Sequence, residues 1–147
     1  MSKPGDRQLV FPTSLLTFAP SPANLAPMAR LARIVAPGVA HHIMQRGNNR
    51  QDVFIADDDG RVYLALIKEQ CEKEGLKVIS YCLMANHTHI VGVPENEHSL
   101  ANAIGRTHFR YARYVNRMHG RSGHLWQNRF HSCVLGPTHL VNTLPVG

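Results

Sequence analysis

Two histidines separated by one residue, in the segment His87-Thr88-His89, are the side chains of this sequence most suited to act together in chemistry. Side chains alternate between the two faces of a β-strand, so both rings would project the same way, roughly 6.6 Å apart along the strand. That spacing lets two imidazoles bind one metal ion. In a helix they would lie about 200° apart around the axis and could not converge. Because the chain holds ten histidines, a chance pair that is only solvated or hydrogen-bonded is the alternative.

The residues around this pair favour a strand. Lys77–Leu83 is rich in β-branched and aromatic residues, and Ile90–Val93 continues that composition. We expect Asp57–Asp59 to cap one helix, Gly75 to end it, and Ser99 to cap a second helix. The expected strands are residues 41–46, 76–84, 87–93 and 130–135. The expected helices are residues 57–74 and 99–118. This β-α-β-β-α-β order predicts an α+β fold with a ferredoxin-like, split βαβ core and an antiparallel sheet.

The second expected helix has two distinct faces. At about 100° per residue, its apolar residues fall in one narrow sector, namely Leu100, Ile104, Tyr111, Val115 and Met118. The opposite face carries a stripe of arginines, namely Arg106, Arg110, Arg113 and Arg117. A solvated helix face is the ordinary explanation of such a stripe. The helix has no acidic residue between Ser99 and Val115, so the arginines have no partner along it. We therefore prefer phosphate contacts as their role.

Composition and charge restrict the class of protein. The 147 residues suffice for one domain, and the hydrophobic content of 44% is ordinary. A net charge of +6 indicates a polyanionic partner, nucleic acid first, with a merely basic soluble protein as the alternative. Cys71, Cys82 and Cys133 lack metal-ligand spacing and are typical of a reduced, cytoplasmic protein. No apolar run approaches the length of a membrane span, so no membrane partner is expected.

The two ends of the chain differ from its middle. Residues 1–27 hold five of the nine prolines and show no sustained periodicity, so we expect a flexible extension there. Residues 28–135 make up the expected domain. The segment 136–147 contains Pro137 and Pro145, which leave little room for a helix, and we expect an irregular tail.

Three motifs in a fixed order resemble one family of DNA-processing proteins. Asn86–Val91 (Asn-His-Thr-His-Ile-Val) is preceded by Gln45–Arg50 (Gln-Arg-Gly-Asn-Asn-Arg) and followed by Leu125–Phe130 (Leu-Trp-Gln-Asn-Arg-Phe). With this order and spacing, the chain resembles the single-tyrosine HUH transposases from about Met28 to Cys133. Within that family it is most similar to the REP-associated tyrosine transposases. The resemblance implies a ferredoxin-like core with both histidines on a central strand.

The resemblance also implies a reaction. Members of the family cut single-stranded DNA next to a hairpin: a tyrosine attacks the phosphate, leaving a 5′-phosphotyrosine bond and a free 3′-OH, and the reverse exchange rejoins the strands. His87 and His89 match the family's catalytic ligands for a divalent ion, Mg²⁺ or Mn²⁺, that polarises the phosphate. Imidazoles alone suit Zn²⁺ as well as Mn²⁺, which leaves the metal open. The implied partners are hairpin single-stranded DNA and, because family members often dimerise, a second copy of the chain.

Side chains in the other two motifs are candidates for DNA contacts. Arg46 and Arg50 flank a Gly-Asn-Asn turn whose backbone N–H groups could hold a phosphate. The alternative is an ordinary β-turn with solvated charges. Trp126 could stack on a base or fill the core. The full set of candidate DNA-binding residues is Arg46, Arg50, Arg106, Arg110, Arg113, Arg117, Trp126 and Arg129.

The catalytic tyrosine is the family feature that this sequence does not match. In the family it lies on a helix after the last strand, with a polar third metal ligand one turn beyond, and its position here falls near Val146. The tail has no tyrosine, so we expect a C-terminally truncated copy without the nucleophile. Tyr63, Tyr81 and Tyr111 are expected to pack in the fold, which leaves Tyr114 as a weak substitute.

Two functions of different classes follow from these features. The first is a transposase-type HUH endonuclease domain that binds hairpin single-stranded DNA and carries out metal-assisted strand cleavage and rejoining. The second is a catalytically dead, DNA-binding remnant of the same fold. A small metal-dependent hydrolase unrelated to DNA is a third alternative.

Overall fold

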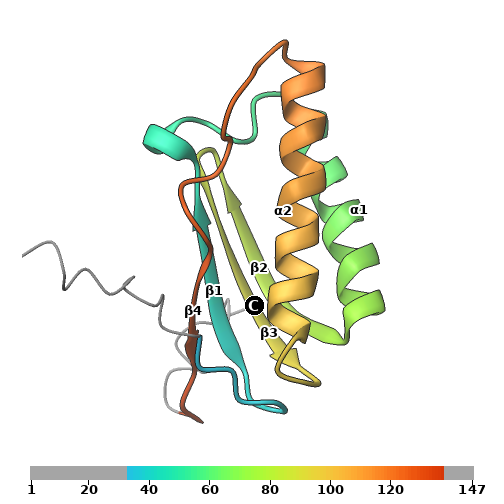
Figure 1. The fold of residues 1–147 in the computed structure, drawn as a ribbon, viewed down its shortest axis with the longest axis vertical. Helices are drawn as coiled ribbons and strands as arrows, with labels where there is room; N and C mark the ends of the chain where they lie inside the picture. Colours follow the sequence, from blue (N-terminus) through green and yellow to red (C-terminus); the bar gives the residue numbers. More distant parts are fainter. Residues whose placement is uncertain (1–32, 138–147) are drawn as a thin grey trace, which may run out of the picture. The chain divides into compact units, whose positions relative to one another are not determined.

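The computed structural model describes residues 33–137. The extension expected over residues 1–27, and residues 138–147 of the expected tail, lie outside the described residues. The described part follows the order β-α-β-β-α-β (Figure 1). Its elements are β1 (His41–Arg46), α1 (Asp57–Glu74), β2 (Leu76–Met84), β3 (His87–Pro94), α2 (Ser99–Met118) and β4 (His131–Val134). A short 3-10 turn, η3 (Asn48–Arg50), follows β1.

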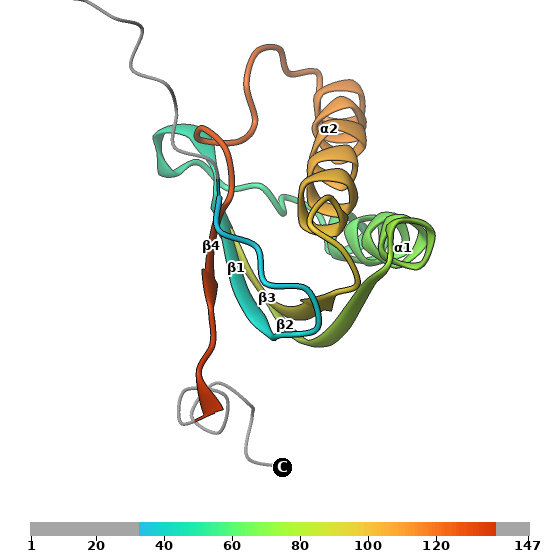
Figure 2. The ribbon, with the colours of Figure 1, turned by 60° about the horizontal axis from the view of Figure 1, so that its bottom comes forward.

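The four strands form one antiparallel sheet. Their spatial order, β2-β3-β1-β4, places β3 and β1 in the middle and β2 and β4 at the edges. Both helices pack on the same face of this sheet, and no α-helix of residues 33–137 covers the opposite face (Figure 2). This is the predicted ferredoxin-like, split βαβ arrangement, so the predicted fold class is confirmed. Neither α1 nor α2 is long and apolar enough to cross a membrane.

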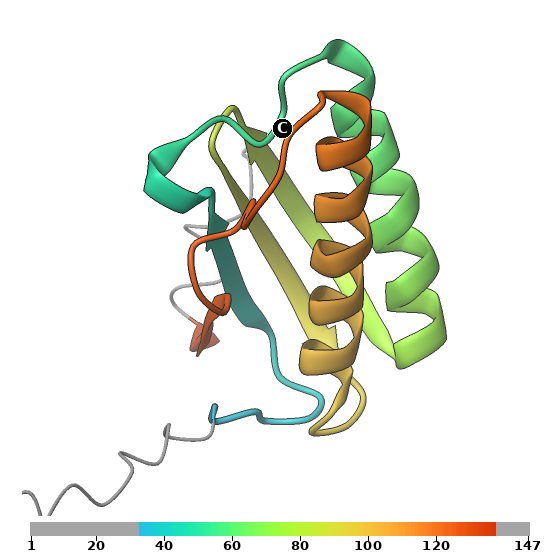
Figure 3. The same ribbon diagram turned by 45° about the horizontal axis from the view of Figure 1, so that its top comes forward.

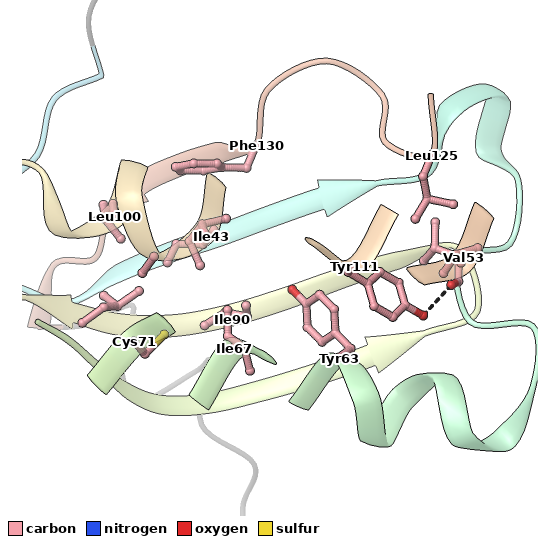
Figure 4. Close-up of a cluster of buried hydrophobic side chains, with 14 residues drawn as sticks. Ile43, Val53, Tyr63, Ile67, Cys71, Ile90, Leu100, Tyr111, Leu125 and Phe130 are labelled. Carbon is pink, nitrogen blue, oxygen red and sulfur yellow. Dashed lines mark hydrogen bonds between the residues drawn. The ribbon is translucent and has the colours of Figure 1, made fainter. Parts of the chain in front are cut away.

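A hydrophobic core fills the space between the helices and the sheet (Figure 4). The strands contribute side chains that alternate toward the helices, such as Ile43 and Ile90. The helices contribute side chains at helical spacing, namely Tyr63, Ile67 and Cys71 from α1, and Leu100, Ile104, Tyr111 and Val115 from α2. The predicted apolar sector of α2 is therefore confirmed except at its end. Met118, the last helical residue, is 62% exposed because the packed stretch of α2 ends at Val115.

The start of α1 is held by one buried carboxylate. The N-cap residue is Ala56, and the side chain of Asp59 in the first turn accepts hydrogen bonds from the N–H groups of Ile55 and Ala56, both at 2.8 Å. Asp59 also accepts from the Tyr114 hydroxyl at 3.0 Å and from Nε2 of His119 at 3.0 Å. Burial raises the pKa of Asp59, but these hydrogen bonds outweigh it and hold the pKa below its usual range. Capping was expected from Asp57–Asp59 together. Only Asp59 provides it, because its carboxylate folds back onto the N–H groups that precede the helix.

The other predicted helix ends differ in accuracy. Gly75 ends α1 in the left-handed conformation, with φ of 70°, as the sequence predicts. At α2 the N-cap is His98, and Ser99 is the first helical residue, so the predicted cap is one residue out of place. The hydroxyl of Ser99 accepts from the backbone N–H of Asn96 at 3.2 Å and stabilises the turn before the helix instead.

A β-bulge in β2 determines which of its side chains face the helices. The register against β3 skips one residue between Val78 and Ser80, so the alternation of faces reverses there. Beyond the bulge, Cys82 and Met84 pair across the sheet with the two histidines of β3. The bulge therefore turns these two side chains onto the face that the helices leave open.

One buried histidine makes the stability of the fold depend on pH. His108 lies on α2, is 7% exposed, and shares a 3.0 Å hydrogen bond between its Nε2 and the hydroxyl of Tyr63. Burial lowers the pKa of His108 to about 3. In the unfolded chain a histidine binds a proton below about pH 6.5. Stability is therefore lost as the pH falls below that value, because the unfolded state takes up a proton that the folded state excludes.

We expect the free energy of unfolding to decrease between about pH 6.5 and pH 4, with His108 contributing up to roughly 1 kcal/mol per pH unit. A His108→Gln variant loses the packing of the buried ring, so it should be less stable at neutral pH. Because glutamine cannot take up the proton, its stability should depend less steeply on pH. Urea unfolding followed by circular dichroism at several pH values measures both quantities. Equal pH slopes in the two proteins would contradict a neutral, buried His108.

Candidate functional site

His87 and His89 project from β3 onto the sheet face that the helices leave open. Thr88 and Ile90, which alternate with them, are only 1% and 2% exposed and belong to the helix side, so strand alternation turns the histidines the other way. Both rings are half-buried. Their centroids lie 5.0 Å apart with the ring planes at 81°. A nitrogen of each ring can therefore contact one common ion.

Side chains of β1 and β2 surround the two histidines on this surface, which we call the histidine face. The cross-strand neighbours of the pair are Met44 and Arg46 from β1, and Cys82 and Met84 from β2. Arg46 lies directly across from His87. None of the strands β1–β4 contains an aspartate or glutamate. A phosphate approaching the histidine face thus meets a guanidinium and no carboxylate from the strands.

Asn86, the residue before β3, joins His87 to the end of β1. The Nδ1–H of His87 donates to Oδ1 of Asn86 at 2.6 Å, since an amide oxygen can only accept. The amide nitrogen of Asn86 donates to the backbone oxygen of Arg50 at 3.3 Å, and its own backbone oxygen accepts from Gly47 at 2.8 Å. In the neutral ring of His87 the lone pair is consequently on Nε2. The two other hydrogen bonds of Asn86 connect the turn over 47–50 to the start of β3.

The turn after β1 carries two of the predicted DNA-contacting arginines. Arg46 ends β1, and Arg50 ends η3 with a positive φ of 56° and is exposed. The segment before β4 runs alongside this turn (Figure 3). There Asn48 donates its N–H to the oxygen of Leu125, and Gln127 donates to the oxygen of Arg46, both at 2.8 Å. The three motifs of the sequence are therefore adjacent in space.

A third histidine, His42 on β1, lies on the histidine face and contacts His89. Nε2 of His42 and Nδ1 of His89 share a hydrogen bond of 2.9 Å. The two ring planes differ by only 4°, and the ring centroids are 5.1 Å apart. With 2.9 Å between the two nitrogens, the rings meet edge to edge and are not stacked face to face. His42 lies outside the three sequence motifs, so the sequence pattern did not single it out. Alternation puts His42 on the same face as Met44, but only the register, which pairs Met44 with His89, brings the rings together.

The surroundings of His89 favour its neutral form. Burial lowers the pKa of His89, and the nearby His42, His87 and Arg46 lower it further. A neutral imidazole keeps a lone pair for a metal ion, whereas a protonated one has none to offer.

The donor set of the site favours some divalent ions over others. Imidazole suits Mn²⁺ and Zn²⁺, whereas Mg²⁺ prefers oxygen ligands. Within residues 33–137, no three His, Cys, Asp or Glu side chains are grouped so that they could hold a metal ion. His87 and His89 fit as two ligands of a divalent ion, and its remaining ligands would have to be oxygens of water or phosphate. This set suits Mn²⁺ better than Mg²⁺.

The arginines of α2 lie in the helix layer, away from the histidine face. Arg106 pairs with Glu74 of α1 at 2.9 Å, and Arg110 pairs with Glu69 at 2.6 Å. The prediction of an unpaired stripe is wrong for these two, because the acids that α2 lacks are supplied by the neighbouring helix. The remaining members of the stripe are exposed, namely Arg113 and Arg117.

Trp126 packs against the helix layer. Its indole N–H donates to the backbone oxygen of His108 at 3.1 Å, and the ring centroids of the two residues are 4.5 Å apart. Trp126 is half-buried against the hydrophobic core. These contacts favour the core role among its two predicted roles, rather than base stacking. Arg129 is exposed shortly before β4.

All four tyrosines of the sequence lie in the described residues, and none is on the histidine face. Tyr63 and Tyr111 are fully buried on the helix side, as predicted. Tyr114, the predicted substitute nucleophile, donates its hydroxyl to Asp59 in the helix layer, on the other side of the sheet from the histidines. Tyr81 was expected to pack in the fold but is 55% exposed, because beyond the bulge it lies at the edge of the helix side.

The turn beside the histidine face requires a glycine at one position. A Cβ on Gly47 would collide with the backbone oxygen of Gln51 and lie 2.8 Å from Cγ1 of Val53. We expect Gly47→Ala to lower the free energy of unfolding by about 1–3 kcal/mol, because the backbone must shift to relieve the overlap.

Gly105 on the exposed side of α2 is the matched control. A Cβ there meets nothing within 4 Å, so Gly105→Ala should stabilise the protein by about 0.5–1 kcal/mol through helix propensity. Chemical denaturation of both variants tests the pair. A Gly47→Ala protein as stable as the wild type would show that the turn can move freely.

Comparisons with known proteins were consistent with this geometry. No curated protein matches the chain. The structure resembles that of a REP-associated tyrosine transposase bound to a REP hairpin, with a TM-score of 0.60 and 14% identity over 78% of this chain and 67% of that one. It also resembles a candidate transposase from Deinococcus radiodurans R1, with a TM-score of 0.56 and 12% identity over 77% of this chain and 91% of that one. At these identities the likeness shows a shared fold.

The sequence itself carries the family assignment. Residues 36–144 match the family described as "Transposase IS200 like". The match covers all three motifs and extends over most of the chain. The predicted family is confirmed: the chain belongs to the IS200-like transposases and contains a transposase domain.

Proposed function

We propose that this transposase domain binds hairpin single-stranded DNA on its histidine face and holds a divalent ion with His87 and His89 for strand cleavage and rejoining through a phosphotyrosine. The observation that carries the proposal is the pair of neighbouring, half-buried imidazoles on the open face of a central strand. A related fold was solved with a REP hairpin, which supports hairpin DNA as the partner. Assembly as a homodimer stays a prediction.

Each side chain of the site has a defined part in this proposal. When bound, the metal ion supplies a Lewis acid next to the scissile phosphate. His87 and His89 would hold it, and Asn86 fixes the ring of His87 so that its Nε2 would face the ion. Arg46, across from His87, neutralises phosphate charge. Arg50 and the backbone of its turn position the neighbouring part of the DNA backbone.

A second candidate function, DNA binding without strand cleavage, is favoured by the position of the tyrosines. The family reaction needs a tyrosine hydroxyl at the phosphate, and no tyrosine of residues 33–137 lies on the histidine face. The proposed phosphate contacts, Arg46 and the turn over 47–50, need no tyrosine. Binding can therefore be tested separately from chemistry.

A labelled hairpin with a single-stranded extension, incubated with the protein in Mn²⁺ or EDTA, distinguishes the two functions. We expect Mn²⁺ to strengthen DNA binding in a mobility-shift assay, and the double variant His87→Ala/His89→Ala to lose that effect, a weakening of at least about tenfold. The surface variant His98→Ala, at the start of α2, should behave as wild type.

The same reactions analysed on a denaturing gel report chemistry. A metal-dependent covalent adduct indicates the cleaving enzyme, and binding without an adduct indicates the second candidate. A hairpin that is not bound under any condition contradicts both.

Two arginine variants test which face of the domain contacts the DNA. Arg46→Ala should weaken binding to every hairpin sequence and reduce the slope of log affinity against log salt by about 1, since one phosphate contact is lost. Arg113→Ala, in the helix layer, should leave the slope unchanged. The reverse result would move the DNA to the arginine stripe of α2.

A further inference from the structure

The hydrogen bond between His42 and His89 restricts which atom of His89 is available to a metal ion. A neutral imidazole has one N–H and one lone pair, so the bond between Nε2 of His42 and Nδ1 of His89 can run in either direction. If His42 donates, the proton of His89 is on Nε2 and that atom cannot bind a metal ion. If His89 donates from Nδ1, its Nε2 keeps the lone pair.

His87 shows the same arrangement with the direction already determined. Its Nδ1–H donates to Oδ1 of Asn86, which leaves Nε2 free. Histidines that bind metals generally donate their second N–H to an acceptor, and this bond selects the tautomer and orients the ring. A matching arrangement at His89 requires Nε2 of His42 as the acceptor.

We propose that His42 is a positioning residue for His89: it accepts the Nδ1–H of His89 and thereby holds the ring with the Nε2 lone pair available to a divalent ion. This inference rests on the proposed metal site. β1 is a central strand paired on both sides, which gives His42 a rigid base. The near-coplanar rings, at 4°, give the bond good alignment.

His42 acts through His89 and is not itself a ligand. Its Nε2 is occupied by the hydrogen bond to His89. Among the described residues, no three candidate ligands are grouped around one point, which a site with His42 as third ligand would need. Each of the two rings is thus held by a hydrogen bond at its own Nδ1. The partner of His87 is its neighbour in sequence, Asn86, and the partner of His89 is His42 on the adjacent strand.

Three variants of the full chain test this role, with Mn²⁺ alone as the probe. His42→Phe keeps a ring but removes the acceptor, and His42→Gln restores an acceptor near the position of Nε2. His131→Phe is the matched control, because His131 is an exposed histidine on the neighbouring strand β4, across from Met44. Thermal unfolding checks that each variant is folded.

The first measurement is the tautomer of His89 in metal-free protein, from long-range ¹H–¹⁵N spectra of the imidazoles. We expect the proton on Nδ1 in the wild type, the His42→Gln variant and the His131→Phe variant, and a shift toward Nε2 in the His42→Phe variant. A merely structural role of His42 would not move this proton. A wild-type proton on Nε2 overturns the inference.

The second measurement is the Mn²⁺ dissociation constant from calorimetry. His42→Phe should weaken binding by about 10-fold or more, while His42→Gln and His131→Phe stay near the wild-type value. Wild-type affinity in His42→Phe overturns the inference and leaves the metal site intact. A loss as large as that of His89→Ala, unrescued by His42→Gln, makes His42 a ligand and also overturns it. If the wild type does not bind Mn²⁺, both the metal site and the inference fail.

Discussion

The alternation of side chains along β3 is the constraint on which the whole site depends. Thr88 and Ile90 are buried under the helices, and because the period of a strand is two, His87 and His89 must point to the other face. A slip of one residue would place both imidazoles in the apolar core and expose Ile90. Burial of the core therefore fixes the direction of the histidines with no polar contact required.

The polar contacts determine something finer, namely the orientation of each ring. Asn86 holds His87 from the turn at one end of β3, while His42 contacts His89 from the middle of the adjacent strand. Asn86 also bonds to Gly47 and Arg50, so the ring of His87 and the turn after β1 are positioned by the same residue.

Much of this fold can be predicted from the sequence because its signals are local. The bounds of β1, α1 and α2 follow from turn residues, the αL glycine at 75 and hydrophobic periodicity, all of which act within one element. The histidine pair is local in the same sense. Its motif also carries the family resemblance, which the match over residues 36–144 confirms.

The features that the sequence did not predict depend on register and on packing between elements. The contact of His42 with His89 needs the pairing of β1 with β3, which no short-range pattern contains. Arg106 and Arg110 have no acidic partner on their own helix, and the pattern of α2 cannot show that Glu74 and Glu69 of α1 lie beside them. Tyr81 was expected to pack, and the bulge does turn it to the helix side, but β2 is an edge strand and the side chain is 55% exposed; the place of a strand in the sheet is not contained in its own composition.

In the proposed function, phosphate binding and the attack on the phosphate are separable for a structural reason. The residues proposed to bind phosphate come from the two central strands, β1 and β3, and from the turn over 47–50 that follows β1. They therefore stay in place for as long as the sheet is folded. A nucleophile has no such support from these strands, because every tyrosine of residues 33–137 belongs to the helix side. The surface proposed to bind phosphate therefore does not depend on the attacking group. In the proposed reaction, the attacking hydroxyl has to reach the histidine face from outside the sheet and helices of residues 33–137.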